Sequence, residues 1–251
     1  MFDDRGSSLA PMVRKLALWQ ELSTGEQEAL LLLPHRLGRI QPGDYIVEQG
    51  TSAEQSCLLL SGFACRHKLT SGGARSISAI HMKGDIVDLQ NSLLGCADHS
   101  VEALTECEVA FIPREAVVEL AFRLPNVGMA MWYDTLVDAS IFREWILNIA
   151  RRDAQARIAH LICEFGVRLE SLGLGDRSSY EFPMTQEQLA DATGLTSVHV
   201  SRTLKELQER GLITRTIRYI AVGDWLSLQQ AGDFDDAYLH LRRRQHSFML
   251  Q

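Results

Sequence analysis

The stretch MTQEQLADATGLTSVHVSRTLKEL, residues 184–207, holds two short helical patterns separated by a glycine. Thr185 and Gln188 form a capping box, which predicts where the first helix begins. Gly194 stands at the end of that helix, because glycine adopts the left-handed backbone conformation at little cost. Thr196 then provides the N-cap of a second helix. The stretch therefore predicts two helices joined by a tight turn.

The apolar residues of this stretch fit two helices that cross closely. Ala190 is small where the helices approach each other, and Val200 is placed to fill the wedge between them. Val200, Leu204 and Leu207 share one face of the second helix. The alternative, a packed helical hairpin with a solvated polar face, gives no reason for caps, glycine and apolar residues to be in register. The spacing favours a helix-turn-helix, whose second helix lies in the major groove of DNA.

The opposite face of the second helix carries side chains that can read DNA. Arg202 can donate two hydrogen bonds to a guanine, and Val198 can contact a thymine methyl group. Lys205 and the threonine caps suit phosphate oxygens. The predicted DNA-contacting residues are Thr185, Thr196, Ser197, Val198, Ser201, Arg202, Lys205 and Arg218.

A small wing is predicted after the second helix. The runs at Leu212–Ile213 and Tyr219–Val222 are typical of two short strands, and the turn between them brings Arg215 and Arg218 near a DNA backbone. The run Arg242–Arg244 is interpreted as a solvated helix end rather than a DNA contact. The C-terminal part of the chain is therefore predicted to be a winged helix-turn-helix.

The segment after Ile40 has the pattern of a β domain. Turn signals such as Pro42-Gly43-Asp44 recur about every ten residues, with short apolar runs between them. In one run, Phe63, Cys65 and Leu69 alternate with basic residues and are expected to face the core. We expect an antiparallel, jelly-roll-like β-roll in this part of the chain.

A long helix is predicted over residues 125–151, with two apolar stripes where a surface helix needs only one. One alternative is a helix buried within its own chain. The other is a helix that packs on its own domain with one stripe and on a second copy of the chain with the other. We predict dimerisation through Met131, Val137, Ile141 and Trp145.

These elements define an α+β protein with three parts: residues 1–124 as N-terminal helix and β-roll sensor domain, residues 125–152 as dimerisation helix, and residues 153–251 as DNA-binding domain. The N-terminal residues 9–38 are expected to be helical, with a capping box at Ser23 and Glu26.

Charge and cysteine content exclude several classes of protein. The net charge is −7, but residues 150–251 carry 13 basic and 13 acidic side chains, so all of the excess acid precedes the predicted DNA reader. The five cysteines include no CxxC pair, which argues against disulfides and zinc.

No apolar run is long enough to span a membrane, and no secretory signal is present, so we expect a cytoplasmic protein. No catalytic, metal or phosphate-binding motif is found, so we expect neither an enzyme nor a cofactor.

At this point the chain resembles the Crp/Fnr family over nearly its whole length. The β-roll turns QPGDYIVEQG, LLLSGF and MKGDIVDL, the long helix and the motif GLTSVHVSR come in the family order. The resemblance implies a dimer that reads a two-fold symmetric site, with Ser201 and Arg202 as the base-reading pair. The commonest readers have a glutamate where this chain has Val198, so its half-site is expected to differ.

Other departures concern the effector. Relatives that bind cyclic nucleotides carry Gly-Glu and Arg-Ser for the phosphate and ribose, and Thr-Ser for the purine. We predict no tight cyclic AMP binding, because the corresponding positions form a degenerate pocket of Asp88, Leu89, His99, Ser100, Phe142 and Arg143.

No cysteine precedes Cys57, which argues against the iron–sulfur cluster of the fumarate–nitrate branch. Haem ligation through His67, His81 or His99 is the less favoured interpretation.

The sequence thus predicts a dimeric, DNA-binding transcription regulator whose partners are double-stranded DNA, a second copy of the chain and RNA polymerase, with no membrane. Its effector is left open: a small acid, the redox state of Cys57, Cys65 or Cys107, or none, since Leu89 and Phe142 are expected to fill the pocket. The alternative function is a ligand-sensing β-roll whose helical C-terminus docks onto a protein partner.

Overall fold

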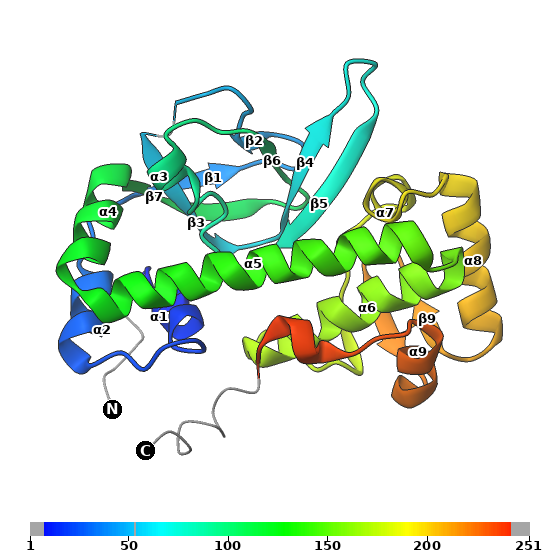
Figure 1. Ribbon diagram of the computed structural model, residues 1–251. Helices are drawn as coiled ribbons and strands as arrows, with labels where there is room; N and C mark the ends of the chain where they lie inside the picture. Colours follow the sequence, from blue (N-terminus) through cyan, green and yellow to red (C-terminus); the bar gives the residue numbers. More distant parts are fainter. Residues whose placement is uncertain (1–7, 53, 242–251) are drawn as a thin grey trace. The chain divides into compact units, whose positions relative to one another are not determined.

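The computed structural model describes residues 8–52 and 54–241 (Figure 1). The chain forms two compact units. The first contains the residues up to Lys68 together with Ala79–Asp138, and the second contains Leu69–Ser78 and the residues from Ala139 onward. The predicted helix end at Arg242–Arg244 lies outside the described residues.

Two antiparallel sheets form the β-roll, which confirms the predicted fold class. Their strand orders are β1-β7-β3 and β2-β6-β4-β5. Short helices precede the strands, interrupt them and follow them (Figure 1). The elements are α1 (Ala10–Leu16), α2 (Thr24–Leu31), β1 (Arg36–Ile40), β2 (Tyr45–Val47), β3 (Gln55–Ser61), β4 (Ala64–Leu69), β5 (Arg75–His81), α3 (Asn91–Leu94), β6 (Ser100–Ala103), β7 (Cys107–Pro113) and α4 (Arg114–Arg123).

The N-terminal region differs from the continuous helical segment expected over residues 9–38. It folds as α1 and α2, and β1 already begins at Arg36. The second helix begins where predicted, because the Ser23 hydroxyl accepts a hydrogen bond from the Glu26 amide and the Glu26 carboxylate accepts one from the Ser23 amide. The capping box inside the segment was predicted, but helix as far as residue 38 was wrong, because α2 ends at Leu31 and Arg36–Ile40 pair with β7.

Strand β4 also departs from simple alternation. Phe63 and Cys65 are buried as expected, but Leu69 is exposed and His67 is 1% exposed. The strand is covered on both faces near its start and leaves the core at its end. Alternation marks the inward face of a strand only where the other face meets water, so the assignment of Leu69 to the core was wrong.

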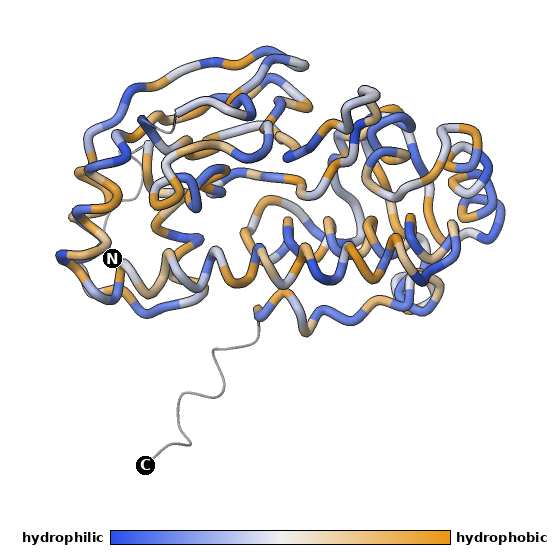
Figure 2. Tube along the Cα trace, turned by 45° about the horizontal axis from the view of Figure 1, so that its top comes forward, coloured by the Kyte–Doolittle hydropathy of each residue, from blue (hydrophilic) through white to orange (hydrophobic). Residues whose placement is uncertain are grey.

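Helix α5 (Pro125–Arg151) occupies the range expected for the long helix, and apolar and polar residues alternate along it in Figure 2. The first stripe is buried within the chain: Met131, Val137, Ile141 and Trp145. Intrachain packing therefore uses the side chains that we had assigned to a partner. The second stripe, which contains Trp132, Leu136, Phe142 and Ile146, is exposed to solvent.

The second unit holds a three-stranded antiparallel sheet, β8-β10-β9, and several helices. The sheet contains the two predicted wing strands and a third, β8, that we had not predicted. Among the described residues, no helix is both long and apolar enough to cross a membrane. The elements are α6 (Ala154–Ser171), β8 (Ser179–Glu181), α7 (Gln186–Thr193), α8 (Ser197–Glu209), β9 (Ile213–Arg215), β10 (Tyr219–Val222), α9 (Trp225–Ala231) and a short 3₁₀ helix, η1 (Asp236–Leu239).

Candidate nucleic-acid interface

Helices α7 and α8 are fixed by the local signals that the sequence contains. The Gln188 side chain accepts a hydrogen bond from the Thr185 amide at 2.9 Å, and the Thr185 hydroxyl accepts one from the Gln188 amide at 3.1 Å. Gly194 ends α7 with φ of 64°, a left-handed conformation that other residues adopt only with strain. The Thr196 hydroxyl then caps α8 by accepting from the His199 amide. The predicted turn between two capped helices is confirmed.

One face of α8 anchors the helix in the second unit. Val200, Leu204 and Leu207 are buried, as is Ala190 on α7. Burying three such side chains stabilises the position of α8 by several kcal/mol, at about 1.5–3 kcal/mol for each large apolar side chain. The anchoring fixes which residues of α8 point outward.

The outward face of α8 carries the predicted DNA-reading residues together. Ser197 and Ser201 are exposed, and Val198 is 78% exposed. The Arg202 guanidinium lies 3.7 Å from the Glu206 carboxylate, and its side chain is 66% exposed. Such solvated ion pairs contribute at most about 1 kcal/mol, so Arg202 can leave Glu206 for a DNA base at little cost. Lys205 is paired in the same loose way with Glu209.

The two arginines of the wing differ in their contacts and in their exposure to solvent. Arg215 is half-buried, and its guanidinium donates a hydrogen bond to the Met184 carbonyl at 3.1 Å. Burial also lowers the pKa of Arg215. This arginine ties the wing to the start of the helix-turn-helix, and its position near a DNA backbone stays a prediction. Arg218 is exposed at the turn between β9 and β10, next to Ile217, whose side chain is 91% exposed.

Sequence reasoning missed one residue of this face. His199 lies in the first turn of α8 between Val198 and Val200, and its side chain is exposed. Its position, one residue after an exposed residue in a capped first turn, was a signal that could have identified it. An imidazole at this position can donate or accept a hydrogen bond at a base edge.

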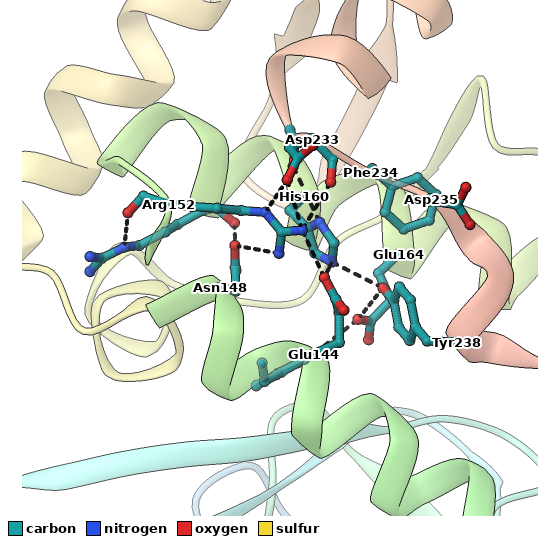
Figure 3. A network of polar contacts seen from close by, with 12 residues as sticks. Glu144, Asn148, Arg152, His160, Glu164, Asp233, Phe234, Asp235 and Tyr238 are labelled. Atoms are coloured by element: carbon teal, nitrogen blue, oxygen red, sulfur yellow. Dashed lines mark hydrogen bonds and ion pairs between the residues drawn. The ribbon is translucent and has the colours of Figure 1, made fainter. Parts of the chain in front are cut away.

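Residues 232–238 of the second unit close a polar network over α5 and α6 (Figure 3). The Glu164 carboxylate accepts hydrogen bonds from the Trp145 indole at 2.9 Å and from the Tyr238 hydroxyl at 2.7 Å. Burial raises the pKa of Glu164. The His160 ring contacts the Gly232 carbonyl and the Tyr238 hydroxyl, and burial lowers its pKa to about 4. The network joins the residues that follow α9 to the consecutive helices α5 and α6.

Replacing Tyr238 with phenylalanine is expected to lower the free energy of unfolding by about 1–3 kcal/mol, because the buried Glu164 carboxylate loses a donor without gaining water. Urea denaturation of the full chain measures the loss. Tyr219→Phe is the matched control, since Tyr219 is 55% exposed and its change should stay within about 0.5 kcal/mol. Equal effects of the two substitutions would show that the network contributes nothing to stability.

Comparison with known proteins identifies both halves of the chain. A cyclic nucleotide-binding domain model matches residues 37–123, and a Crp-like helix-turn-helix domain model matches residues 156–231. The chain is 27% identical to the transcriptional activator protein FnrL of Cereibacter sphaeroides, over 79% of this chain and 82% of that protein. The chain belongs to the Crp/Fnr family of transcription regulators.

Further members of the Crp/Fnr family give the same picture. The fumarate and nitrate reduction regulatory protein of Escherichia coli is 24% identical over 84% of both chains. The solved structure of FixK2 from Bradyrhizobium japonicum superimposes with a TM-score of 0.73 at 24% identity, covering 79% of this chain and 98% of that chain. The helix-turn-helix match ends at residue 231, so the segment that carries Tyr238 follows the shared domain.

In the first unit, the residues at the family's effector positions are engaged with their own chain. The Asp88 carboxylate accepts a hydrogen bond from the Cys57 amide at 2.8 Å, and the Ser100 hydroxyl accepts one from the Gln49 amide at 3.1 Å. Burial lowers the pKa of His99, whose ring is hydrogen-bonded to Asp98. An uncharged imidazole cannot replace the arginine that pairs with a cyclic phosphate.

An ion pair lies beside these effector positions. The Arg66 guanidinium donates two hydrogen bonds to the Asp138 carboxylate, at 2.6 and 2.8 Å, and Arg66 holds the pKa of Asp138 down against the effect of burial. Both charges are close enough to His99 to influence its pKa. Leu89 is buried as expected, whereas Phe142 is 45% exposed, and its role as a filling residue stays a prediction. Arg143 is exposed and belongs, like Phe142, to the second unit.

Proposed function

We propose that this Crp/Fnr protein binds a two-fold symmetric DNA site as a homodimer, with α8 of each copy in a major groove. The observation that carries the proposal is the outward face of α8, where Ser201 and Arg202 stand exposed on a helix held by buried Val200 and Leu204. A helix that is anchored on its buried side and has its donors exposed to solvent is what base reading requires. RNA polymerase is the expected protein partner, and the cytoplasm is the expected compartment.

Each exposed residue has an assigned role at the DNA. Arg202 forms the bidentate contact with guanine, Ser201 contacts a base or phosphate, and Val198 packs on a thymine methyl group. His199 adds a further polar contact in the first turn. Phosphate contacts position the helix and come from Thr185, Thr196, Ser197, Lys205 and Arg218.

The exposed stripe of α5 supports the homodimer. Trp132 is 60% exposed and Ile146 is 52% exposed, a surface that a soluble monomer rarely presents along one helix. An apolar pocket of about 250 Å³ adjoins Trp132 and is lined also by Leu93 and Phe122. A second α5 packing along this stripe would cover it, as paired helices with apolar seams do.

We propose further that DNA binding needs no cyclic nucleotide. In a relative with a cyclic nucleotide, a cation of the pocket pairs with the anionic effector. Here Arg66 supplies the cation and Asp138 the anion, so the chain forms the ion pair by itself. The pair joins β4 to α5, so it can hold the long helix on the β-roll without a ligand. A ligand-sensing module with a protein-docking C-terminus is less well supported, because the polar face of α8 has the composition of a DNA reader.

Replacing Arg202 with alanine tests the DNA-reading role. In the homodimer the substitution removes one bidentate guanine contact from each half-site, and each loss should weaken binding to the preferred duplex by about 1–3 kcal/mol, roughly 5- to 150-fold. A gel-shift titration measures it. Arg210→Ala is the control, since Arg210 is an exposed arginine at the far end of α8. Unchanged affinity of the Arg202 variant would refute the assignment.

A further inference from the structure

A polar cavity of about 310 Å³ opens in the first unit beside β2, β3 and α3. Its wall includes the aromatic rings of Tyr45 and Phe111. Glu48 and Glu54 line it and are exposed, whereas Asp88 and Asn91 line it and are buried. The cavity therefore has an acidic rim and a buried polar floor.

The floor contains an amide with unused hydrogen-bonding capacity. Asn91 is 1% exposed, and neither its Oδ1 nor its Nδ2 atom has a hydrogen-bond partner. An unpaired buried polar group costs about 1–3 kcal/mol, so native proteins rarely keep one without a reason. Because Asn91 lines the cavity, a bound molecule is the partner that can satisfy it.

The charges around Asn91 define the chemistry of that molecule. Asp88 lies on the same floor, and burial raises its pKa to about 7, so an adjacent cation would favour its ionised form. Glu48 and Glu54 add negative charge at the rim. No lysine, arginine or histidine is among the described residues that line the cavity. The charged side chains that line the cavity are all acidic, so they disfavour an anion.

We propose that this cavity binds a small organic cation that carries a primary ammonium group and a hydrogen-bond acceptor. The ammonium donates to Asn91 Oδ1 and pairs with the Asp88 carboxylate, while Asn91 Nδ2 donates to the acceptor. Tyr45 provides an aromatic surface that cations favour, whereas the Phe111 ring already has the Arg36 guanidinium 4.6 Å from its centroid. The cavity shares Asp88 with the family's nucleotide positions, but Leu89, His99 and Ser100 do not line it, and it stands independently of the DNA-reading role.

Three probes with the same four-carbon backbone and one shared hydroxyl separate the effect of charge: 4-amino-1-butanol, 1,4-butanediol and 4-hydroxybutyrate. Isothermal titration calorimetry on the full chain at pH 8, where Asp88 is largely ionised, should show saturable binding of the amino alcohol. Its affinity should exceed that of the diol by at least about 10-fold, and 4-hydroxybutyrate should not bind.

Variants locate the binding. Asn91→Ala and Glu48→Gln should each weaken amino alcohol binding by at least about 5-fold. Glu119→Gln, an exposed acid on α4, should change nothing. Glu48 is a surface residue, so its variant decides the matter if Asn91→Ala fails to fold. The proposal is overturned if the amino alcohol gives no saturable heat, if the diol or 4-hydroxybutyrate binds equally well, or if the two variants bind like the parent. Duplex binding by the same preparations tests the DNA-reading role separately.

Discussion

Replacing both Leu136 and Ile146 with glutamate is expected to convert the proposed homodimer to a monomer. Both side chains are about half exposed on the solvent side of α5, so the single chain should tolerate the change. In a dimer, the same change would bury four carboxylates without partners, which costs several kcal/mol for each unpaired charge. Sedimentation velocity measures the oligomeric state directly.

Loss of the dimer should also remove most DNA affinity. Two linked reading heads gain affinity because the second binds at high effective concentration, so the monomeric variant should bind a symmetric duplex at least about 100-fold more weakly. Leu226→Glu is the matched control, since Leu226 is 70% exposed on α9 and lies off the stripe. A double variant that still sediments as a dimer would contradict the assignment of the partner face.

Replacing Asp88 with asparagine is expected to abolish a loss of folding stability that the parent protein shows as the pH rises. The pKa of Asp88 rises from 3.8 to about 7 in the folded chain, mainly because of burial. A carboxyl group with a raised pKa favours the folded state only when protonated. Ionisation of Asp88 therefore costs no folding stability below about pH 4. The cost grows as the pH rises to about 7 and then levels off. Between pH 5 and pH 8, the parent should lose about 2–3 kcal/mol relative to Asp88→Asn.

Chemical denaturation of both proteins across that range measures the difference. Asp98→Asn provides a control of opposite sign, since the hydrogen bond from His99 lowers the pKa of the Asp98 carboxyl. A lowered pKa contributes stability above the unfolded value and loses it as the pH falls, so the stability advantage of the parent over Asp98→Asn should shrink near pH 4 and below. If the difference between the parent and Asp88→Asn stays constant from pH 5 to pH 8, Asp88 is not a buried titrating acid.

Local signals explain why the helix-turn-helix could be predicted from sequence. The caps at Thr185 and Thr196 and the turn at Gly194 act within a few residues, so each is visible without knowledge of the fold. The β-roll could be predicted from its turns, but the exposure of Leu69 could not, because burial of a strand end depends on what packs over it.

Long-range packing explains what the sequence could not predict. Both stripes of α5 are apolar, and only the folded chain shows that Met131 and Trp145 are buried while Ile146 is not. Arg66 pairs with an aspartate 72 residues away, and the Arg215 guanidinium binds a backbone carbonyl. Neither contact leaves a periodic pattern. The unpartnered amide of Asn91 is equally a property of the assembled cavity.

Selection of bound sequences from a random duplex pool, without added cyclic nucleotide, tests the central claim most directly. The account predicts enrichment of a two-fold symmetric sequence whose half-sites are centred about one helical turn apart and contain a guanine contacted by Arg202. The same selection with the Arg202→Ala protein should lose the preference at that guanine while keeping the spacing. Enrichment of no sequence, or of a site without symmetry, would contradict the account.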